Sequence, residues 1–455
     1  MPLSEADAKD LVARELLPAF LAERERLDRI DRWYRWSHDE PHSPRQATRE
    51  YKELAGRAQT PWLGLVVTSV AQALYVEGYR RAREPDNAEP WSWWQANGMD
   101  ARQVAVHRAA LAYGLAYATV LPGEDDTGTA MPVIRGVSPR RMMAFYEDPA
   151  DDDWPKVALR GDPAKVDGQH GWKLRLYDET SVYYLKAAGG AMELERVEAH
   201  DLGLCPVVRY ANMLDLEGRA DGEVEPFIPV AARIDQTVFD RLVVQRFASW
   251  VVRTIAGMAK PDKPEEAAAE KLRLKVEDIL VAEDPDTKFG SLPATQLDGF
   301  IKAVEEDIRA LAAVTQTPPH HLLGQMANLS AEALAAAEAS LSRKVEERKH
   351  MFGESHEQVL RLAATVAGDT AGARDVSAQV RWRDMESRSL AQTADALGKL
   401  AQMLAVPVEA LWERIPGVTQ QDVDRWKALA EQGGGLEALM RELADGQTSP
   451  AGELV

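Results

Sequence analysis

Carboxylates are the side chains of this sequence whose spacing comes nearest to a catalytic or metal-binding pattern. Residues 124–126 (Glu-Asp-Asp) and 151–153 (Asp-Asp-Asp) each place three acidic groups in a row, and carboxylate oxygens are ligands for hard divalent cations. Turn-forming residues adjoin both runs, since Gly123 precedes the first and Pro149 and Pro155 flank the second. We therefore expect two solvated turns. A metal-dependent nuclease that uses these carboxylates is the enzymatic alternative.

The nine histidines do not form a set with metal-ligand spacing. His320 and His321 are adjacent, so we expect their side chains to diverge, and the six-residue separation of His350 and His356 does not place them on one helix face. The sequence lacks a phosphate-binding loop, a dinucleotide-binding glycine motif, a His-Glu-x-x-His zinc motif and a nucleophile elbow. No catalytic residue, metal or cofactor is therefore predicted, and the chain is not expected to be an enzyme.

Composition narrows the class of protein further. The chain has 455 residues, of which 45% are hydrophobic and 28% charged, and this balance is typical of a globular protein of about three domains. The longest uncharged apolar stretch, residues 109–121, is far shorter than the ~20 residues of a membrane span, and the first residues lack the pattern of a secretory signal. Cys205 is the single cysteine, which excludes an internal disulfide and predicts a small buried hydrophobe in a reducing compartment.

The charge balance is strongly acidic, with 54 basic against 73 acidic residues and a net charge of −19. This argues against a protein that coats DNA by neutralising phosphates, but not against one that handles DNA without gripping it. Between Pro229 and Lys260, however, five basic residues outnumber two acidic ones, which gives +3; the basic residues are Arg233, Arg241, Arg246, Arg253 and Lys260, and the acidic ones are Asp235 and Asp240. Such a segment is either a guide for a polyanion or an ion-pairing partner of an acidic helix.

A mainly helical chain with one β-rich region must position these residues. Strand-forming residues and the Gly189-Gly190 turn signal predict short strands within residues 116–213. Pro18 is expected to kink or restart the first helix. Apolar residues at helical spacing predict helices at residues 10–36, 62–80, 91–120, 226–258, 296–316 and 385–446.

The longest predicted helix runs from Ala331 to about residue 366, with Ser330 as its N-cap. Alanines crowd its first turns, and small side chains such as that of Ala336 let another helix approach closely. We expect this start to pack against an adjacent subunit, and we expect Gly353 to let the helix bend.

Four stretches of the sequence resemble a known family. Their order and spacing over residues 220–400 resemble the portal proteins of tailed bacteriophages, in the branch typical of siphophages of actinobacterial hosts; the N-terminal part resembles them mainly in layout. The stretches are Gly222-Glu-Val-Glu-Pro226, Asp286-Thr-Lys-Phe-Gly290, Thr317-Pro-Pro-His-His-Leu-Leu-Gly324 followed by Asn328-Leu-Ser-Ala-Glu-Ala-Leu334, and Trp382-Arg-Asp384 followed by Ser389-Leu-Ala-Gln-Thr-Ala-Asp395.

The resemblance implies an α+β, mainly helical portal fold with wing, stem, clip and crown, which assembles as a ring around a central channel. The clip is short for the family. The implied segments are a wing with an α/β body at residues 1–225, stem helices at 226–258 and 296–316, a clip at 259–295, a tunnel loop at 317–330, a long kinked helix and wing return at 331–384, and a crown with a frayed tail at 385–455.

The resemblance also implies a function and partners. The ring, usually of twelve subunits, would sit at one capsid vertex, where the genome is packaged and ejected and where the terminase and the head–tail adaptor dock. Expected partners are further copies of the chain, double-stranded DNA, the terminase large subunit, the head–tail adaptor, and the major capsid and scaffolding proteins, with no membrane. The expected location is the virion, and the host cytoplasm during assembly. Twelve copies at −19 give −228, and a mostly repulsive tunnel lets a polyanion slide.

Two groups of residues are the expected DNA-contact sites. In the tunnel loop, His320, His321, Gln325 and Asn328 offer neutral polar contacts, although Leu322, Leu323 and Met326 equally suit a buried helix–helix connector. In the stem, the predicted guide or ion-pair residues are Arg233, Arg241, Arg246 and Arg253. The rival interpretation is another ring-forming head-completion or connector protein, although small connectors lack the stem–clip–stem order.

Overall fold

The chain forms two compact units in the computed structural model, which describes residues 3–42, 49–82, 89–125, 127–166, 168–248, 253–256, 288–291, 297–324, 331–384, 390–415 and 417–431. The first unit, here called the body, comprises Met1–His38, Pro61–Ile228 and Val314–Val455. The second, here called the insert, comprises Asp39–Thr60 and Pro229–Ala313. Residues 39–60 therefore belong with the insert, whereas the sequence grouped them with residues 1–225.

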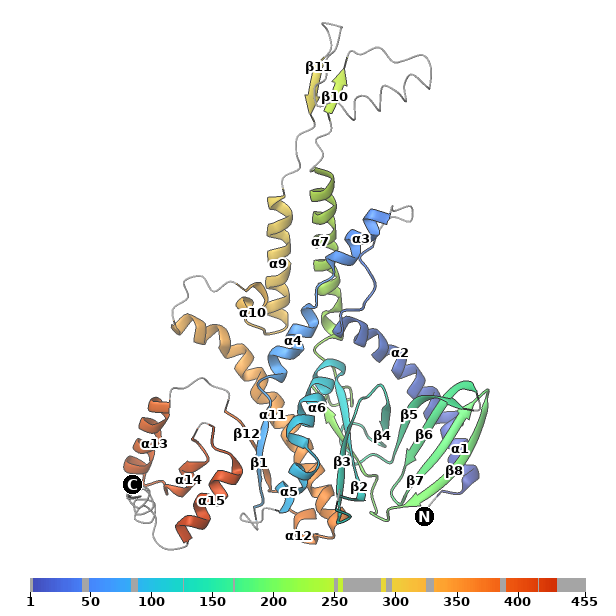
Figure 1. Cartoon of the computed structure of the whole chain (residues 1–455), viewed down its shortest axis with the longest axis vertical. Helices are drawn as coiled ribbons and strands as arrows, with labels where there is room; N and C mark the ends of the chain where they lie inside the picture. The colour runs from blue at the N-terminus through green and yellow to red at the C-terminus, as the bar shows by residue number, and fades with distance from the viewer. Residues whose placement is uncertain are drawn as a thin grey trace, which may run out of the picture. The chain divides into compact units, whose positions relative to one another are not determined.

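The N-terminal helices pack on the larger sheet of the body (Figure 1). α1 (Glu5–Leu11), a π-helical turn (Val12–Leu16) and α2 (Leu17–Tyr34) follow one another without a break. Proline cannot donate a backbone hydrogen bond, and the turn directly before Pro18 widens to the π form. The predicted disturbance at Pro18 is confirmed as a change of winding.

Two antiparallel sheets confirm the β-rich region. The five-stranded sheet is a meander in the order β4-β5-β6-β7-β8, and the three-stranded sheet has the order β3-β2-β9. Gly189 and Gly190 form the turn between β7 and β8 with φ values of +59° and +83°, as a tight hairpin requires. The strands are β2 (Leu115–Glu124), β3 (Ala130–Val137), β4 (Met142–Phe145), β5 (Val157–Val166), β6 (Gln169–Tyr177), β7 (Ser181–Ala188), β8 (Ala191–Ala199) and β9 (Val207–Ala211).

Two helix predictions in the body, 62–80 and 91–120, are wrong at their C-terminal ends, where strands begin. Helix α4 (Trp62–Ala71) is followed by strand β1 (Val76–Arg80), and α5 (Glu89–Ala96) and α6 (Met99–Tyr113) are followed by β2. Residues 115–120 are apolar on both faces of β2, so their periodicity does not separate a strand from a helix. Gly114 ends α6 with φ +90°, which is the local signal for the change.

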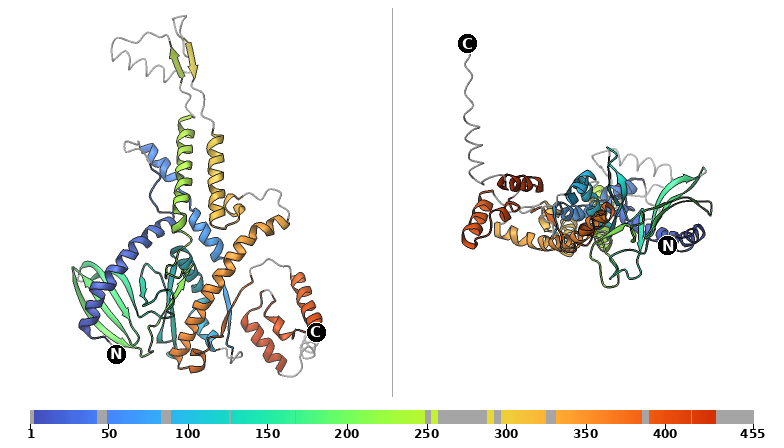
Figure 2. Two further views of the ribbon diagram at one scale, coloured as in Figure 1. Left: turned by 180° about the vertical axis from the view of Figure 1, so that it is seen from behind. Right: turned by 90° about the horizontal axis from the view of Figure 1, so that it is seen from below.

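The predicted long helix is present as α11 (Ala331–Ala367), 37 residues in length. It packs against β2, β3 and β9 and against β12 (Gln379–Trp382), which pairs with β1 (Figures 1 and 2). Helical structure is continuous through Gly353, where a Cβ would lie at ordinary contact distance, 3.5 Å, from atoms of Trp382 and Val380. The bend that Gly353 predicts stays a prediction.

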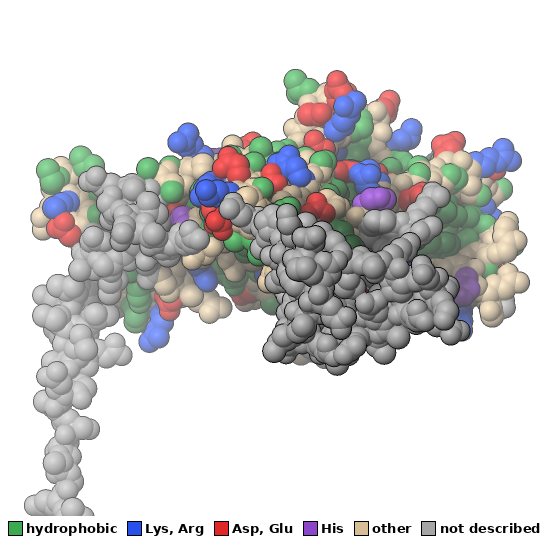
Figure 3. Space-filling view, turned by 90° about the horizontal axis from the view of Figure 1, so that it is seen from above, with side chains coloured by type: hydrophobic (Ala, Val, Ile, Leu, Met, Phe, Trp, Pro, Cys, Tyr) green, Lys and Arg blue, Asp and Glu red, His purple; other side chains and the backbone are tan. Residues whose placement is uncertain are grey.

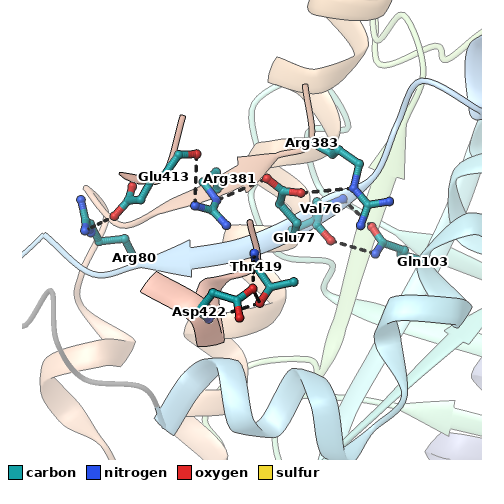
Figure 4. A network of polar contacts seen from close by, with 9 residues as sticks. All are labelled: Val76, Glu77, Arg80, Gln103, Arg381, Arg383, Glu413, Thr419 and Asp422. Atoms are coloured by element: carbon teal, nitrogen blue, oxygen red, sulfur yellow. Dashed lines mark hydrogen bonds and ion pairs between the residues drawn. The ribbon is translucent and has the colours of Figure 1, made fainter. Parts of the chain in front are cut away.

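Short helices complete the C-terminal part of the body: α12 (Thr370–Ala373), α13 (Leu390–Leu404), α14 (Glu409–Trp412) and α15 (Gln420–Glu431). Polar contacts join the β1–β12 ribbon to the residue that follows α14 (Figure 4). Glu77 on β1 pairs with Arg381 on β12 and with Arg383 just after it, and Arg80 pairs with Glu413 just after α14. The prediction of helices over residues 385–446 is confirmed for the described residues of that range.

The insert contains two long helices, α7 (Ile228–Ala248) and α9 (Asp298–Val314), and an antiparallel strand pair, β10 (Arg253–Ala256) with β11 (Lys288–Ser291). The prediction of one helix over residues 226–258 is therefore wrong at β10. A further helix, α3 (Arg49–Ala58), was missed because its sequence is highly charged; its Ala55 and Ala58 pack against Phe239 of α7.

Within the described part of the chain, no helix combines the length and the apolar character that a membrane crossing requires.

Candidate functional site

A one-turn helix leads from the insert back to α11. This helix, α10 (Pro319–Leu323), begins with proline in its first turn and ends at Gly324, whose φ is +66° and whose N–H donates to the carbonyl of His320. The expected tunnel loop at 317–330 thus contains helical structure. Leu322 is buried, which suits the connector interpretation for this part of the segment.

His320 and His321 converge, contrary to the expectation that adjacent histidines diverge. The Nε2 atoms of His320 and His321 lie 3.0 Å and 3.1 Å from the same Oε1 of Glu338 on α11. Their rings meet edge to face with centroids 4.6 Å apart. A single helical turn positions both rings toward α11, and sequence spacing alone did not indicate Glu338.

A buried ion triad lies one to three turns further along α11. Lys344 Nζ donates to Glu223 Oε2 at 2.6 Å, and Arg348 Nη2 lies 3.2 Å from Glu223 Oε1; all three side chains are almost completely buried. Lys344 also donates to the carbonyl of Thr315 at 2.9 Å. Burial lowers the pKa of Lys344, an effect that the Glu223 carboxylate opposes.

This triad contacts the chain close to both crossings, which are the two points where the chain passes between the body and the insert. Glu223 precedes the crossing at Ile228–Pro229, and Thr315 follows the crossing at Ala313–Val314. One ammonium group therefore contacts the segment that leaves the body and the segment that returns to it. The sequence indicated Glu223 only as part of Gly222-Glu-Val-Glu-Pro226 and gave no signal for its partners.

The predicted stem arginines have different surroundings. Arg233 pairs with Asp307 of α9 at 2.9 Å, which is the ion-pair alternative, while Arg241 is half-buried and Arg246 is exposed. Arg253 lies on β10, so it does not continue α7. Helix α7 itself carries three arginines against Asp235 and Asp240, a net charge of +1.

The remaining predicted site residues are quickly placed. Gln325 and Asn328 lie outside the described residues. The acidic runs form turns: Asp125 accepts from the backbone N–H groups of Thr127 and Thr129, and Asp152 Oδ2 accepts from those of Glu147 and Asp148. Asp126 is outside the described part. Cys205 is buried, and burial raises the pKa of its thiol.

A second histidine pair is fully buried in the body. His356 on α11 accepts at Nδ1 from the Tyr210 hydroxyl (2.8 Å), and its Nε2 lies 2.8 Å from Nε2 of His107 on α6. His107 Nδ1 faces the Leu74 carbonyl at 3.3 Å. A carbonyl only accepts, so Nδ1 of His107 carries the proton and its Nε2 accepts from His356. Burial lowers the pKa of His107 to about 4 and that of His356 well below its usual value.

Comparison with known proteins identifies the family. The sequence profile described as "Phage portal protein, SPP1 Gp6-like" matches residues 14–434. The chain belongs to this portal protein family. A portal protein of Mycobacterium phage D29 is 30% identical over 366 residues, which are 74% of this chain and 71% of the relative. A portal protein of Mycobacterium phage L5 is 29% identical over 375 residues, or 77% and 74% of the two chains.

The family assignment covers more of the molecule than the motifs that suggested it. The stretches that carried the resemblance lie within residues 220–400, whereas the profile begins at residue 14 and so includes the β-rich part of this portal protein. It agrees with an α+β fold and with a structural, capsid-associated protein of a bacteriophage. The polar groups that sequence reasoning missed, namely Glu338, the Glu223 triad and the His107–His356 pair, are all held by α11.

Proposed function

We propose that this portal protein forms a closed ring at one vertex of a tailed-phage capsid and that the genome passes through its channel during packaging and ejection. The insert is the observation that carries the proposal. Arg233 of α7 pairs with Asp307 in the middle of α9, and the two helices lie side by side (Figure 1), as expected of a stem that leaves a helix–sheet body and returns to it. The role is structural rather than enzymatic.

The parts of the ring follow from this proposal. Residues 1–225 with the two sheets are the wing, α7 and α9 are the stem, the chain between them with β10 and β11 is the clip, and α13–α15 belong to the crown. The terminase large subunit and the head–tail adaptor would dock at the clip, and the major capsid and scaffolding proteins would surround the ring, which we expect to hold twelve copies in the virion.

Exposed apolar side chains support self-association. Ile301 on α9, and Met403 and Leu404 on α13, are exposed in the single chain. Ala336 on the first turns of α11 is also exposed. A closed ring supplies each subunit with a neighbour on both sides, and exposed apolar groups are what such contacts bury.

Charge supports sliding contact with DNA rather than tight binding. Figure 3 shows basic and acidic side chains interspersed on the described part of one face, and the whole chain is acidic. We retain Gln325 and Asn328 as proposed neutral DNA contacts. The same proposal for His320 and His321 has to account for Glu338, which engages the Nε2 atoms of both residues.

Ring formation is tested directly on the purified chain by mass photometry and cryo-electron microscopy. We expect ring-sized particles with a central channel, and a monomer at every salt and protein concentration would contradict the proposal. Ala336→Leu should block assembly, since overpacking costs ~1–3 kcal/mol at each repeated interface. Ala336→Ser, which adds a single oxygen atom, is the matched control and should assemble.

DNA contact is tested by packaging assays with variants of the segment between α10 and α11. Gln325→Ala and Asn328→Ala should assemble and package DNA poorly. If both variants package normally while Leu322→Ala abolishes assembly, the segment is a helix–helix connector and not a DNA contact.

A further inference from the structure

Three potential metal ligands meet where α10 faces the first turns of α11. The ligand atoms of His320, His321 and Glu338 all lie within 4.8 Å of one another. Ligand atoms around a tetrahedral ion are separated by roughly 3.3–3.6 Å, as follows from metal–ligand bonds of ~2.0–2.2 Å. The observed separations of 3.0 Å and 3.1 Å between the imidazole nitrogens and Glu338 Oε1 therefore need to open by only a few tenths of an ångström.

We propose that His320, His321 and Glu338 bind one divalent transition-metal ion, for which Zn²⁺ is the best match. Two imidazole nitrogens and one carboxylate oxygen suit Zn²⁺ and its neighbours, whereas Mg²⁺ and Ca²⁺ prefer sites made of oxygen alone. Three protein ligands leave one tetrahedral position for water. Acidic clusters elsewhere in the described chain, such as the turns around Asp125 and Asp152, supply no imidazole.

The surroundings favour a formed yet accessible site. The side chains of His320, His321 and Glu338 are 9%, 34% and 34% exposed, so one ring is fixed by packing while the other two ligands can be reached by an ion. The ligands come from two different helices, and both ends of α10 are fixed, by Pro319 and by Gly324. A bound ion would therefore fasten α10 to α11.

The inference does not depend on the proposed ring, because all three ligands belong to one chain. Without an ion, the same Glu338 oxygen hydrogen-bonds to His320 and lies 3.1 Å from Nε2 of His321. Glu338→Gln separates the two possibilities, because a glutamine oxygen still accepts hydrogen bonds but is a much weaker metal ligand.

The test uses full-length protein from which any polyhistidine tag has been cleaved and metals have been removed with a chelator. Zn²⁺ is titrated in by calorimetry, and Co²⁺ by its visible absorption. We expect one ion per chain and no competition from millimolar Mg²⁺, which prefers oxygen ligands. Zn²⁺ should also raise the melting temperature.

Variants assign the ion to this site. Glu338→Gln should weaken binding at least tenfold, and the double variant His320→Ala/His321→Ala should abolish it, with folding checked by circular dichroism. His170→Ala removes an exposed histidine from β6 and should bind like the wild type. Absence of a one-to-one complex in the wild type, or unchanged binding in Glu338→Gln, would overturn the proposal and leave only a cluster of polar side chains without an ion.

Discussion

The two halves of α11 are attached to the body by opposite kinds of chemistry. The first half carries charge: Lys344 and Arg348 are buried against Glu223, and Glu338 meets two histidines. The second half buries mainly apolar side chains, such as those of Val359 and Leu360, and its single buried imidazole, His356, is neutral and faces another neutral imidazole. Gly353 stands between the two halves.

This difference shows how one helix can be fixed at one end and adjustable at the other. Buried apolar contacts change little with salt or pH above neutrality, whereas charged contacts respond to loss of a partner, to protonation and to metal ions. The adjustable half is the one that contacts the two chain crossings and α10. The predictions below change one half at a time.

Removal of the Glu223 charge, which faces the first half of α11, should cause the largest loss of stability. Glu223→Gln keeps the shape of the side chain but leaves Lys344 buried without a counter-charge and Arg348 paired only with the exposed Glu347. We expect a loss of ~3–5 kcal/mol of unfolding free energy, measured by urea denaturation. Glu217→Gln, which alters an exposed pair with Arg219, is the control and should change stability by less than ~1 kcal/mol. An equally small effect of Glu223→Gln would show that the triad is not buried in solution.

Acid should destabilise the protein through the buried His107–His356 pair, which attaches the second half of α11 to α6. The unfolded chain takes up protons at its histidines near pH 6.5, whereas the folded chain resists protonation of His107 until about pH 4. Between these values the unfolded state binds more protons, so stability is fully present above pH 6.5 and falls as the pH decreases, by ~1.4 kcal/mol per pH unit.

Denaturation at a series of pH values from 7.5 to 4.5 measures this loss. The double variant His107→Asn/His356→Gln has no titratable group at this site and should show a shallower dependence on pH. Equal slopes for the variant and the wild type would contradict the assignment of the acid response to this pair.

Loss of one hydroxyl should have a moderate effect. Tyr210→Phe removes the donor to His356 Nδ1 and leaves a buried acceptor without a partner, which should cost ~1–3 kcal/mol. Thermal denaturation at pH 7.5 measures it. Tyr184→Phe, which removes an exposed hydroxyl bonded to Glu198, is the matched control and should cost less.

The smallest change in stability is expected for a substitution at Gly353, which lies between the two halves of α11. Gly353→Ala replaces the weakest helix former with the strongest, for a gain of up to ~1 kcal/mol, and its Cβ meets only ordinary contacts at 3.5 Å. Assembly should be unaffected. If the bend is needed for the movement of α10 relative to the second half, DNA packaging should change while stability rises; a loss of stability would show that Gly353 has a packing role.

The sequence predicted elements better than it predicted sites. The length and position of α11, the β-rich region and the Gly189-Gly190 turn followed from periodicity and turn chemistry. The strands β1 and β10 were predicted as helix because short apolar stretches fit either period. The convergence of His320 and His321 on Glu338 required the geometry of a one-turn helix against a long one, and the Glu223 triad joins residues more than a hundred positions apart. Neither the Glu338 cluster nor the Glu223 triad can be predicted from the spacing of residues in the sequence.

The contact of Lys344 with both crossings also bears on chain entropy. Residues 229–313 form a loop whose ends are already brought together, and the entropy of closing a loop grows only with the logarithm of its length, by ~0.6 kcal/mol per doubling. The body therefore has little thermodynamic reason to prefer one length of insert over another. Lengthening, shortening or exchanging the chain between α7 and α9 should be nearly neutral for the body, so that this portal protein can change what its insert reaches while its scaffold stays the same.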